Sequence, residues 1–336
     1  MTEILIFFVI TVLLTLISKK FKILPSFIGE NHQLFVNKKK IPLIGGVLFL
    51  IPSIYLFYEK NLFFCFAVFF IFFVGFLSDT GILSSPKIRI FFQTFIIAST
   101  VYFLDVQISS TKIILLDKII EIKFFGIIFS IFCLMILING SNFIDGLNGL
   151  LLGYCLIILF VLLKLNLLNI LQFEKDLLLF LFSGLLIMLF FNYLNFFYLG
   201  DGGSYSIGLV LGFLLITIYE STNISPFFII LLLWYPCFEN LFSVIRKNKL
   251  NNSPIIADNK HLHQLLFFYI KNKFLKENLV SNNFSSVLIN TYNLVVMIIG
   301  SMNIYSSNLQ ILLITLNILL YNIFYRYLFI YRFKKK

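Results

Sequence analysis

Charge is scarce in this sequence. Asp, Glu, Lys and Arg make up only 12% of its 336 residues, whereas a typical soluble domain has about 25%. Hydrophobic residues make up 60%, and the mean hydropathy is +0.99. This balance excludes a soluble globular domain and predicts an integral membrane protein.

Cysteine and histidine are also few. The four cysteines, none of them in a C-x-x-C pair, all lie in apolar stretches: Cys65, Cys133, Cys155 and Cys237. Only three histidines are present, and no cysteine is expected near them. A disulfide framework is therefore excluded, and a zinc site is disfavoured.

Apolar runs of about 16 to 22 residues recur along the whole chain and predict transmembrane helices. They cover residues 3–18, 43–59, 61–77, 90–105, 125–140, 147–164, 177–196, 204–220, 226–244, 284–301 and 308–330. We therefore expect an all-α integral membrane protein with about eleven transmembrane helices. Residues 1–336 would form a single polytopic domain.

The basic residues are distributed unevenly between the two predicted sides of the membrane. Of the 26 Lys and Arg residues, only six lie in the even-numbered connections, at positions 60, 112, 118, 123, 164 and 175. Because cytoplasmic loops carry the excess of Lys and Arg, the N-terminus is expected outside and the C-terminus in the cytoplasm. The net charge of +11 is thus a topology signal, and no nucleic-acid partner is expected.

The polar residues gather in the predicted cytoplasmic loops, where we expect the catalytic loops. The outer loops are short and plain apart from residues 106–124, which alternate weakly and predict a small external β-hairpin. A transporter would instead place its polar groups near the bilayer midplane. The distribution therefore favours an enzyme that acts at the membrane surface over a multispan transporter or lipid flippase.

One predicted cytoplasmic loop, residues 139–150, reads N-G-S-N-F-I-D-G-L-N-G-L between two uncharged apolar runs. An ionisable residue at the end of a membrane helix is costly, so Asp145 is a candidate for function. Asp79 and Asp201, with the amides of Asn139 and Asn142, lie on the same predicted side. Such hard oxygen ligands suit Mg²⁺, with Mn²⁺ as an alternative.

Phosphate binding is indicated by two further segments. Gly200 and Asp201 begin a G-D-G-G-S run that leads into an apolar helix, and backbone N–H groups there would favour an anion. Lys87 and Arg89 could bind phosphate oxygens, or anchor the chain to lipid headgroups. His261 and His263 could hydrogen-bond a diphosphate or a sugar.

Simpler structural roles are open for some of these residues. Asp145 could cap a helix without any chemistry. Glu239 and Arg246, seven residues apart, could pair on one helix face.

Taken in order, these loops resemble the polyprenyl-phosphate N-acetylhexosamine-1-phosphate transferase superfamily, glycosyltransferase family 4, over about residues 38–264. N-x-x-N-x-x-D-G-x-x-G-L is matched by Asn139, Asn142, Asp145, Gly146, Gly149 and Leu150. The other motifs are matched by Phe197, Gly200, Asp201, Gly203 and Ser204, by Pro86, Lys87, Arg89 and Gln93, and by His261 and His263.

Three positions depart from the family pattern. The paired acids of the family are Ser78 and Asp79 here, so one carboxylate is absent. An arginine expected in the first cytoplasmic loop is Leu43, and the third position of the histidine element is Gln264. Since the other motif residues remain, we expect a subgroup that uses another sugar rather than an inactive relative.

The resemblance implies transfer of a sugar-1-phosphate of the N-acetylhexosamine type from a UDP-sugar to polyprenyl (undecaprenyl) phosphate, with release of UMP. Asp201 and Asn142 would hold Mg²⁺. Asp79, Asp145 and Lys87 would be catalytic, with Asp145 favoured for positioning over a base or nucleophile. The substrate-binding residues would be Asn139, Gly200, Arg89, His261 and His263.

The family context predicts the cytoplasmic membrane of a bacterium and the start of a lipid-linked surface glycan such as O-antigen. The GlcNAc-type branch is preferred because the histidine element is not a run of three histidines. Three alternatives remain open: the peptidoglycan translocase that uses UDP-MurNAc-pentapeptide, a transporter or flippase, and a scaffold inactivated at Ser78. A homodimer is compatible with the sequence.

Overall fold

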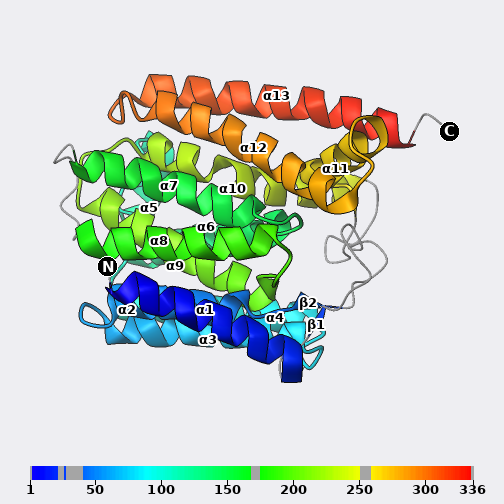
Figure 1. Cartoon of the computed structure of the whole chain (residues 1–336). Helices are drawn as coiled ribbons and strands as arrows, with labels where there is room; N and C mark the ends of the chain where they lie inside the picture. Colours follow the sequence, from blue (N-terminus) through cyan, green and yellow to red (C-terminus); the bar gives the residue numbers. More distant parts are fainter. Residues whose placement is uncertain (1, 22–25, 28–40, 168–174, 250–258, 334–336) are drawn as a thin grey trace.

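A computed structural model describes residues 2–21, 26–27, 41–167, 175–249 and 259–333 (Figure 1). Within these ranges it has thirteen helices and one two-stranded sheet. The helices are α1 (Thr2–Phe21), α2 (Gly45–Phe57), α3 (Leu62–Asp79), α4 (Pro86–Phe103), α5 (Ile114–Ile120), α6 (Lys123–Ile144), α7 (Leu150–Leu167), α8 (Lys175–Tyr193), α9 (Gly200–Glu220), α10 (Pro226–Lys249), α11 (Leu262–Lys273), α12 (Asn278–Gly300) and α13 (Ser307–Phe333). The strands β1 (Ser26–Phe27) and β2 (Ile41–Pro42) pair antiparallel.

The helical class is confirmed, and each of the eleven expected apolar segments falls on a helix. Eight helices in the described ranges are long and apolar enough to cross a membrane. Among the other helices, α2 has only 13 residues, and α7 is likewise one of the shorter apolar helices. The count of eleven crossings and their orientation therefore stay predictions, as does the assignment of the whole chain to one domain.

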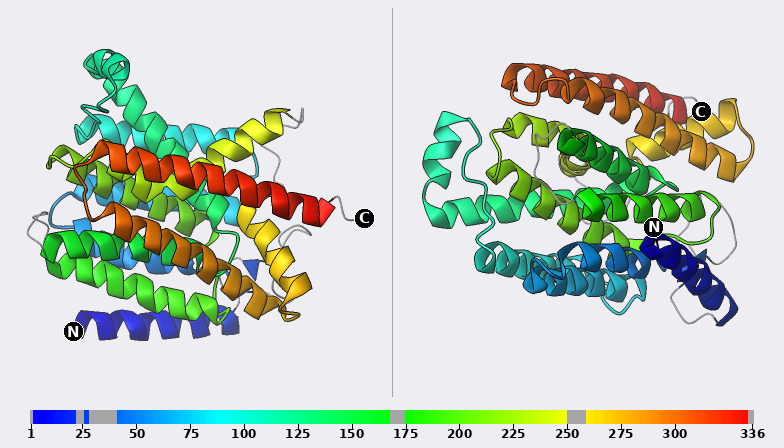
Figure 2. Two further views of the ribbon diagram at one scale, coloured as in Figure 1. Left: turned by 90° about the horizontal axis from the view of Figure 1, so that it is seen from above. Right: turned by 60° about the vertical axis from the view of Figure 1, so that its left-hand side comes forward.

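The external β-hairpin predicted for residues 106–124 is wrong, because this segment carries α5, which projects from the bundle (Figure 2). Leu115 and Leu116 recur four residues later as Ile119 and Ile120, which is a helical spacing. The Asp117 carboxylate accepts hydrogen bonds from the backbone and hydroxyl of the preceding loop. These local bonds replace a strand ladder.

Helix α9 lies at the centre of the bundle and packs against α2, α3 and α6. Almost every residue from Gly202 to Ile218 is buried. Its small residues allow close approach: a Cβ on Gly208 would lie 2.7 Å from the Cα of Ile138. The first residues of α9 are thereby fixed against the ends of α3 and α6.

Both strands, α11 and the C-terminal end of α13 lie at one end of the bundle, on the right in Figure 1. Helices α3 and α6 end here, and α4, α7 and α9 begin here. We call this the site end and the opposite end the far end. The lysine run at 38–40 lies outside the described residues.

Candidate active site at one end of the helix bundle

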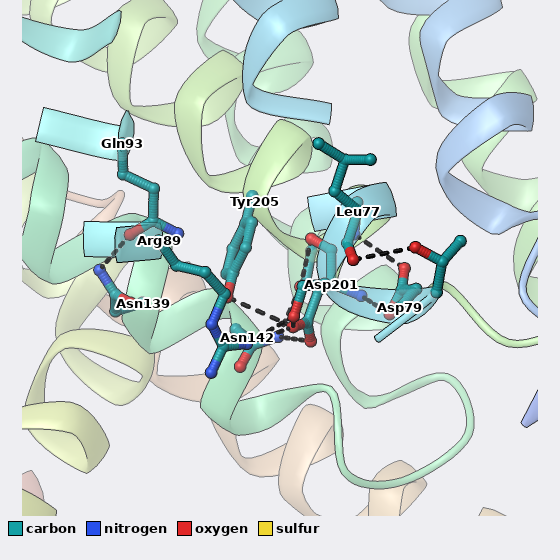
Figure 3. Close-up of polar contacts among 12 residues, drawn as sticks. Leu77, Asp79, Arg89, Gln93, Asn139, Asn142, Asp201 and Tyr205 are labelled. Carbon is teal, nitrogen blue, oxygen red and sulfur yellow. Dashed lines mark hydrogen bonds and ion pairs between the residues drawn. The ribbon is translucent and has the colours of Figure 1, made fainter. Parts of the chain in front are cut away.

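Most of the predicted site residues lie at helix termini of the site end, and Figure 3 shows the side chains of Asp79, Arg89, Asn142 and Asp201 close to one another. Asp79 is the last residue of α3, Asp201 the second residue of α9, and Asp145 the residue that follows α6. Arg89 lies in the first turn of α4. Residues more than 100 positions apart are thus brought together because α9 packs between α3 and α6.

Both carboxylate oxygens of Asp201 accept hydrogen bonds. Oδ1 accepts from Nδ2 of Asn142 at 2.7 Å. Oδ2 accepts from Nη1 of Arg89 at 2.8 Å, from Oγ of Ser78 at 2.7 Å and from the Tyr205 hydroxyl at 3.4 Å. The Arg89–Asp201 ion pair is partly open, since both side chains are about a quarter exposed, at 24% and 25%.

Asp79 faces the backbone of α9. Its Oδ1 accepts a hydrogen bond from the N–H of Asp201 at 2.9 Å and its Oδ2 from the N–H of Gly202 at 3.3 Å. Gly200 has φ +72, and a Cβ there would lie 2.5 Å from Oδ2 of Asp79. Asp79 therefore supplies, from a different helix, the carboxylate that the N-terminus of α9 needs.

The amides predicted for the site divide into two roles. Asn142 donates to Asp201 and, at 3.0 Å, to the Ser204 hydroxyl. Asn139, one turn further from the site end, donates to Oε1 of Gln93 and to a backbone carbonyl of its own helix. Only Asn142 is therefore in contact with the acidic residues.

Asp145 differs from the other acids. Its backbone N–H closes the last turn of α6, but within the described part of the chain no hydrogen bond reaches its carboxylate. Burial raises the pKa of the Asp145 carboxyl well above its usual range, and the negative charges of Asp201 and Asp79 raise it further. Because the half-buried Asp145 carboxylate has no partner in the described chain, it is suited to bind a cation or to accept a hydrogen bond from a ligand.

The turn that follows Asp145 is held by asparagines from two other helices. The N–H of Gly149 donates to Oδ1 of Asn192 at 2.6 Å, and the N–H of Asn148 donates to Oδ1 of Asn282 at 2.8 Å. Asn290 donates to the carbonyl oxygen of Gly149 at 3.0 Å. These bonds satisfy buried backbone groups and fix the turn that carries Asp145.

His261 is anchored by a buried carboxylate that the sequence did not connect with it. Its Nδ1 lies 2.9 Å from Oε1 of Glu239, which is 1% exposed. The Tyr321 hydroxyl donates to Oε2 of Glu239 at 2.8 Å. Glu239 thus pairs with His261 rather than with Arg246, which contacts Ser243 and Tyr325.

His263 is fully buried, and neither ring nitrogen has a hydrogen-bond partner among the described residues. Its ring stacks on that of His261 at 5.6 Å. Burial lowers the pKa of His263 to about 3, with a further lowering by His261 that the Glu239 charge opposes. A Cβ on Gly146 would clash with its Nε2, so the ring lies directly beside the residue that follows Asp145.

Lys87 does not join this cluster. It is exposed in the first turn of α4, and no hydrogen bond or ion pair reaches it within the described residues. It remains two residues from Arg89, at the same helix terminus. The side chain is therefore available to a ligand that enters at the site end.

Several residues make contacts in the site that the sequence alone did not predict. They are Ser78, Ser204, Tyr205, Glu239, Tyr321 and the asparagines of α8 and α12. A lone Glu239 within an apolar helix was the clearest available signal, because buried acids in membrane helices need a partner. The sequence offers Arg246 on the same helix as its partner, whereas His261, which precedes α11, is brought to Glu239 only by the fold.

The residues fit a divalent cation that is held together with a ligand. No group of three or more His, Cys, Asp or Glu side chains in the described ranges is placed to hold a metal alone. Asp201, Asn142 and the unpartnered Asp145 supply oxygen ligands of the kind Mg²⁺ uses, with substrate phosphates and water completing the shell.

A comparison of the sequence with known protein families gives a match. Residues 61–219 match the family described as "Glycosyl transferase family 4". This segment spans α3 to α9 and includes Asp79, Asp145 and Asp201, whereas His261 and His263 lie beyond it. A search of curated proteins gave no match. The match covers just under half of the chain and supports its assignment to the glycosyltransferase family 4 superfamily, whose members are transferases.

Proposed function

We propose that the protein transfers a sugar-1-phosphate from a UDP-sugar to a polyprenyl phosphate, such as undecaprenyl phosphate, and releases UMP. The observation that carries this proposal is the unpartnered Asp145 carboxylate, which lies with the Arg89–Asp201 pair at helix termini inside the family-matched segment. Carboxylates and cationic side chains lie together at one end of a bundle of apolar helices. Such an end can bind a soluble anion and the phosphate of a membrane lipid at the same time.

In the proposed reaction, an oxygen of the lipid phosphate attacks the β-phosphorus of the UDP-sugar. The new P–O bond joins the lipid phosphate to the sugar phosphate, and the bond from the β-phosphorus to the bridging oxygen breaks. UMP leaves with the electron pair. No general base is strictly required, because a phosphate monoester with a second pKa near 6 is mostly dianionic at neutral pH.

The chain's residues would bind and orient the two anions. Arg89 and the exposed Lys87 would bind phosphate oxygens as charge develops on the leaving UMP. Asp145 would position the reacting groups, and His263, with both ring nitrogens unpartnered in the described chain, would hydrogen-bond the diphosphate or the sugar. His261, fixed by Glu239, would support His263 through their stacked rings.

Mg²⁺ is the proposed cofactor, with Mn²⁺ as a substitute, and it would neutralise charge on the diphosphate oxygens when bound. Asp201 and Asn142 are the residues proposed to hold it. Their hydrogen bond at 2.7 Å keeps the two oxygen-bearing side chains together.

Asp79 has a narrower proposed role than its position in the motif implies. Both of its oxygens accept backbone N–H groups of α9. We therefore propose that Asp79 positions Asp201, while its contact with the lipid phosphate stays a prediction from the resemblance.

We propose that the site faces the cytoplasm of a bacterium, with the N-terminus outside and the C-terminus inside. The excess of Lys and Arg in the odd-numbered connections of the predicted topology supports this orientation. The donor would be a UDP-N-acetylhexosamine of the GlcNAc type, and the product would start a lipid-linked surface glycan such as O-antigen. This choice of branch rests on the His-Leu-His-Gln element alone.

A transporter is disfavoured by where the acids lie. Asp79, Asp145 and Asp201 are at helix termini of one end, whereas transport sites are typically formed by interrupted helices near the midplane. The amides that hold the turn after Asp145 are likewise at the site end. The arrangement thus supports chemistry at one membrane surface.

The test is UMP release by purified protein with undecaprenyl phosphate, Mg²⁺ and a panel of UDP-N-acetylhexosamines. We expect UMP with one donor, dependent on both lipid and metal, and lost in Asp201→Asn. Asp176→Asn removes one exposed carboxylate in the first turn of α8, at the far end, and is the matched control. Absence of UMP with every donor, from protein with an unchanged unfolding temperature, would refute the proposal.

A further inference from the structure

Ser78 occupies the position where the first of two paired acids was expected, and its hydroxyl makes two short hydrogen bonds. It donates to Oδ2 of Asp201 at 2.7 Å and accepts from Nη1 of Arg89 at 2.6 Å. The same Nη1 lies 2.8 Å from the same Oδ2. Ser78, Arg89 and Asp201 therefore form a closed triangle of three contacts.

A hydroxyl can close this triangle because it donates one proton and accepts at its lone pairs. An ionised carboxylate at position 78 could only accept. It would repel Asp201 and compete with it for Arg89. The serine thus directs the guanidinium to Asp201, whereas an acid at this position would share it.

The triangle also determines what a cation would meet at Asp201. Oδ1 accepts from Asn142, and Oδ2 accepts from Arg89, Ser78 and Tyr205. Oδ2 already accepts from three donors, so a divalent cation that binds this oxygen displaces at least one of them, whereas Oδ1 keeps a second lone-pair position beside Asn142. Of the three donors at Oδ2, Arg89 is the charged one and is the one that a divalent cation repels, and its removal costs more than the loss of a neutral hydrogen bond.

We propose that Ser78 is a positioning residue that holds Arg89 on Asp201 as a resident cation, so that a divalent metal competes with Arg89 for this carboxylate. The inference rests on the proposed function for its choice of Asp201 as the metal-binding residue. Metal binding without nucleotide is then weak. A nucleotide diphosphate strengthens it, because the phosphate oxygens give Arg89 an alternative anionic partner.

The test is a titration of the purified protein in detergent with Mn²⁺, in which free Mn²⁺ is followed by electron paramagnetic resonance without nucleotide. Ser78→Ala and Arg89→Gln are expected to bind Mn²⁺ about two- to fivefold more tightly than the wild type, the upper range for a charged pair that is partly exposed. Ser78→Thr keeps the hydroxyl and is expected to restore the wild-type affinity.

Lys87→Gln is the matched control, because it removes the same charge two residues away from an exposed side chain without contacts in the described chain. It is expected to change the Mn²⁺ affinity by less than about twofold. If Arg89→Gln and Ser78→Ala bind no more tightly than Lys87→Gln, the competition is refuted. Wild-type binding by Asp201→Asn would refute it as well.

The unfolding temperature of each variant identifies any loss of fold, and Arg89→Gln tests the same competition independently of Ser78. UMP release by the wild type is measured in parallel. Wild-type UMP release with unchanged Mn²⁺ affinities would refute the inference and leave the proposed function intact. Absence of UMP with the expected affinities would refute the proposed function and leave the competition at Asp201 in place.

Discussion

The N-terminus of α9 and the turn between α6 and α7 both carry acidic residues, yet they satisfy them in opposite ways. Asp79 and Asp201 accept hydrogen bonds at all four of their carboxylate oxygens. Asp145 has no side-chain partner in the described chain, and the neighbouring His263 has none at either nitrogen. In the first region a ligand must compete with hydrogen bonds that the protein already makes, whereas the second region lacks partners that a ligand could supply.

The difference follows from the helix ends that the two regions occupy. Acids at the start of α9 are stabilised by unpaired N–H groups, whereas Asp145 follows the C-terminus of α6, where carbonyl groups disfavour negative charge. Burial in the second region adds to this cost. The acids at the N-terminus of α9 are therefore stabilised within the protein, whereas Asp145 in the turn after α6 is not. A ligand that pairs with Asp145 would remove this cost, and its binding would be strengthened accordingly.

The largest effect is expected from Asp145→Asn, which removes the unpartnered carboxyl group without changing the shape of the side chain. UMP release should fall by about 10²–10³-fold, the range for loss of one positioned electrostatic group. Because the folded state raises the pKa of Asp145, the ionised carboxylate destabilises the fold at neutral pH. The unfolding temperature in detergent should therefore stay the same or rise.

A fall in both activity and unfolding temperature would contradict this contrast. It would show that Asp145 stabilises the fold as Asp79 does. Asp176→Asn at the far end serves again as the charge-matched control.

Asp79→Ala should have the opposite profile, because it removes both acceptors from the N-terminus of α9. We expect a loss of about 1–2 kcal/mol in the free energy of unfolding, the upper range for a helix cap. Asp79→Asn keeps one acceptor and should lose less. Denaturant titrations in mild detergent, together with UMP release, measure both effects.

The Asn variant separates the two roles of Asp79. If it abolishes UMP release with the wild-type unfolding free energy, the catalytic role predicted from the resemblance is correct and positioning is secondary. If activity stays within about tenfold of wild type, a catalytic carboxylate is excluded.

The sequence predicted the apolar helices well because length and composition decide them. It also predicted that Asn142, Asp145 and Asp201 belong together, since their motifs occur in a recognisable order. It could not predict that Asp79 faces the backbone of α9, because that contact joins residues 122 positions apart. The pairing of Glu239 with His261 was missed for the same reason.

Ser78 and the segment 106–124 show a second limit. From the sequence, Ser78 is a missing acid, and only the positions of Arg89 and Asp201 show that its hydroxyl serves as both donor and acceptor. The weak alternation in 106–124 predicts a hairpin. Side-chain hydrogen bonds to Asp117 and the spacing of the leucines and isoleucines favour α5 instead.

The smallest expected effect concerns His263 and the dependence of stability on pH. Its folded pKa of about 3 lies below the ordinary value near 6.5, so the unfolded state binds more protons between these values. Stability from this group is therefore complete well above pH 6.5 and is lost as the pH falls. At about pH 6 the wild type has lost about 0.8 kcal/mol of unfolding free energy through this group. His263→Phe lacks the titrating imidazole and should not show this loss. The measurement is the change with pH in the difference between the unfolding free energies of the wild type and the variant.

Binding of a nucleotide diphosphate tests whether the unpartnered region around His263 is where the ligand binds. If a nucleotide diphosphate supplies the partner that His263 lacks, its negative charge raises the folded pKa of the imidazole toward the ordinary value. Saturating UDP with Mg²⁺ should then reduce the wild-type minus His263→Phe difference at pH 6. An undiminished difference would show that the ligand does not reach His263, and the proposed role of this histidine would be wrong while that of Asp145 could still hold.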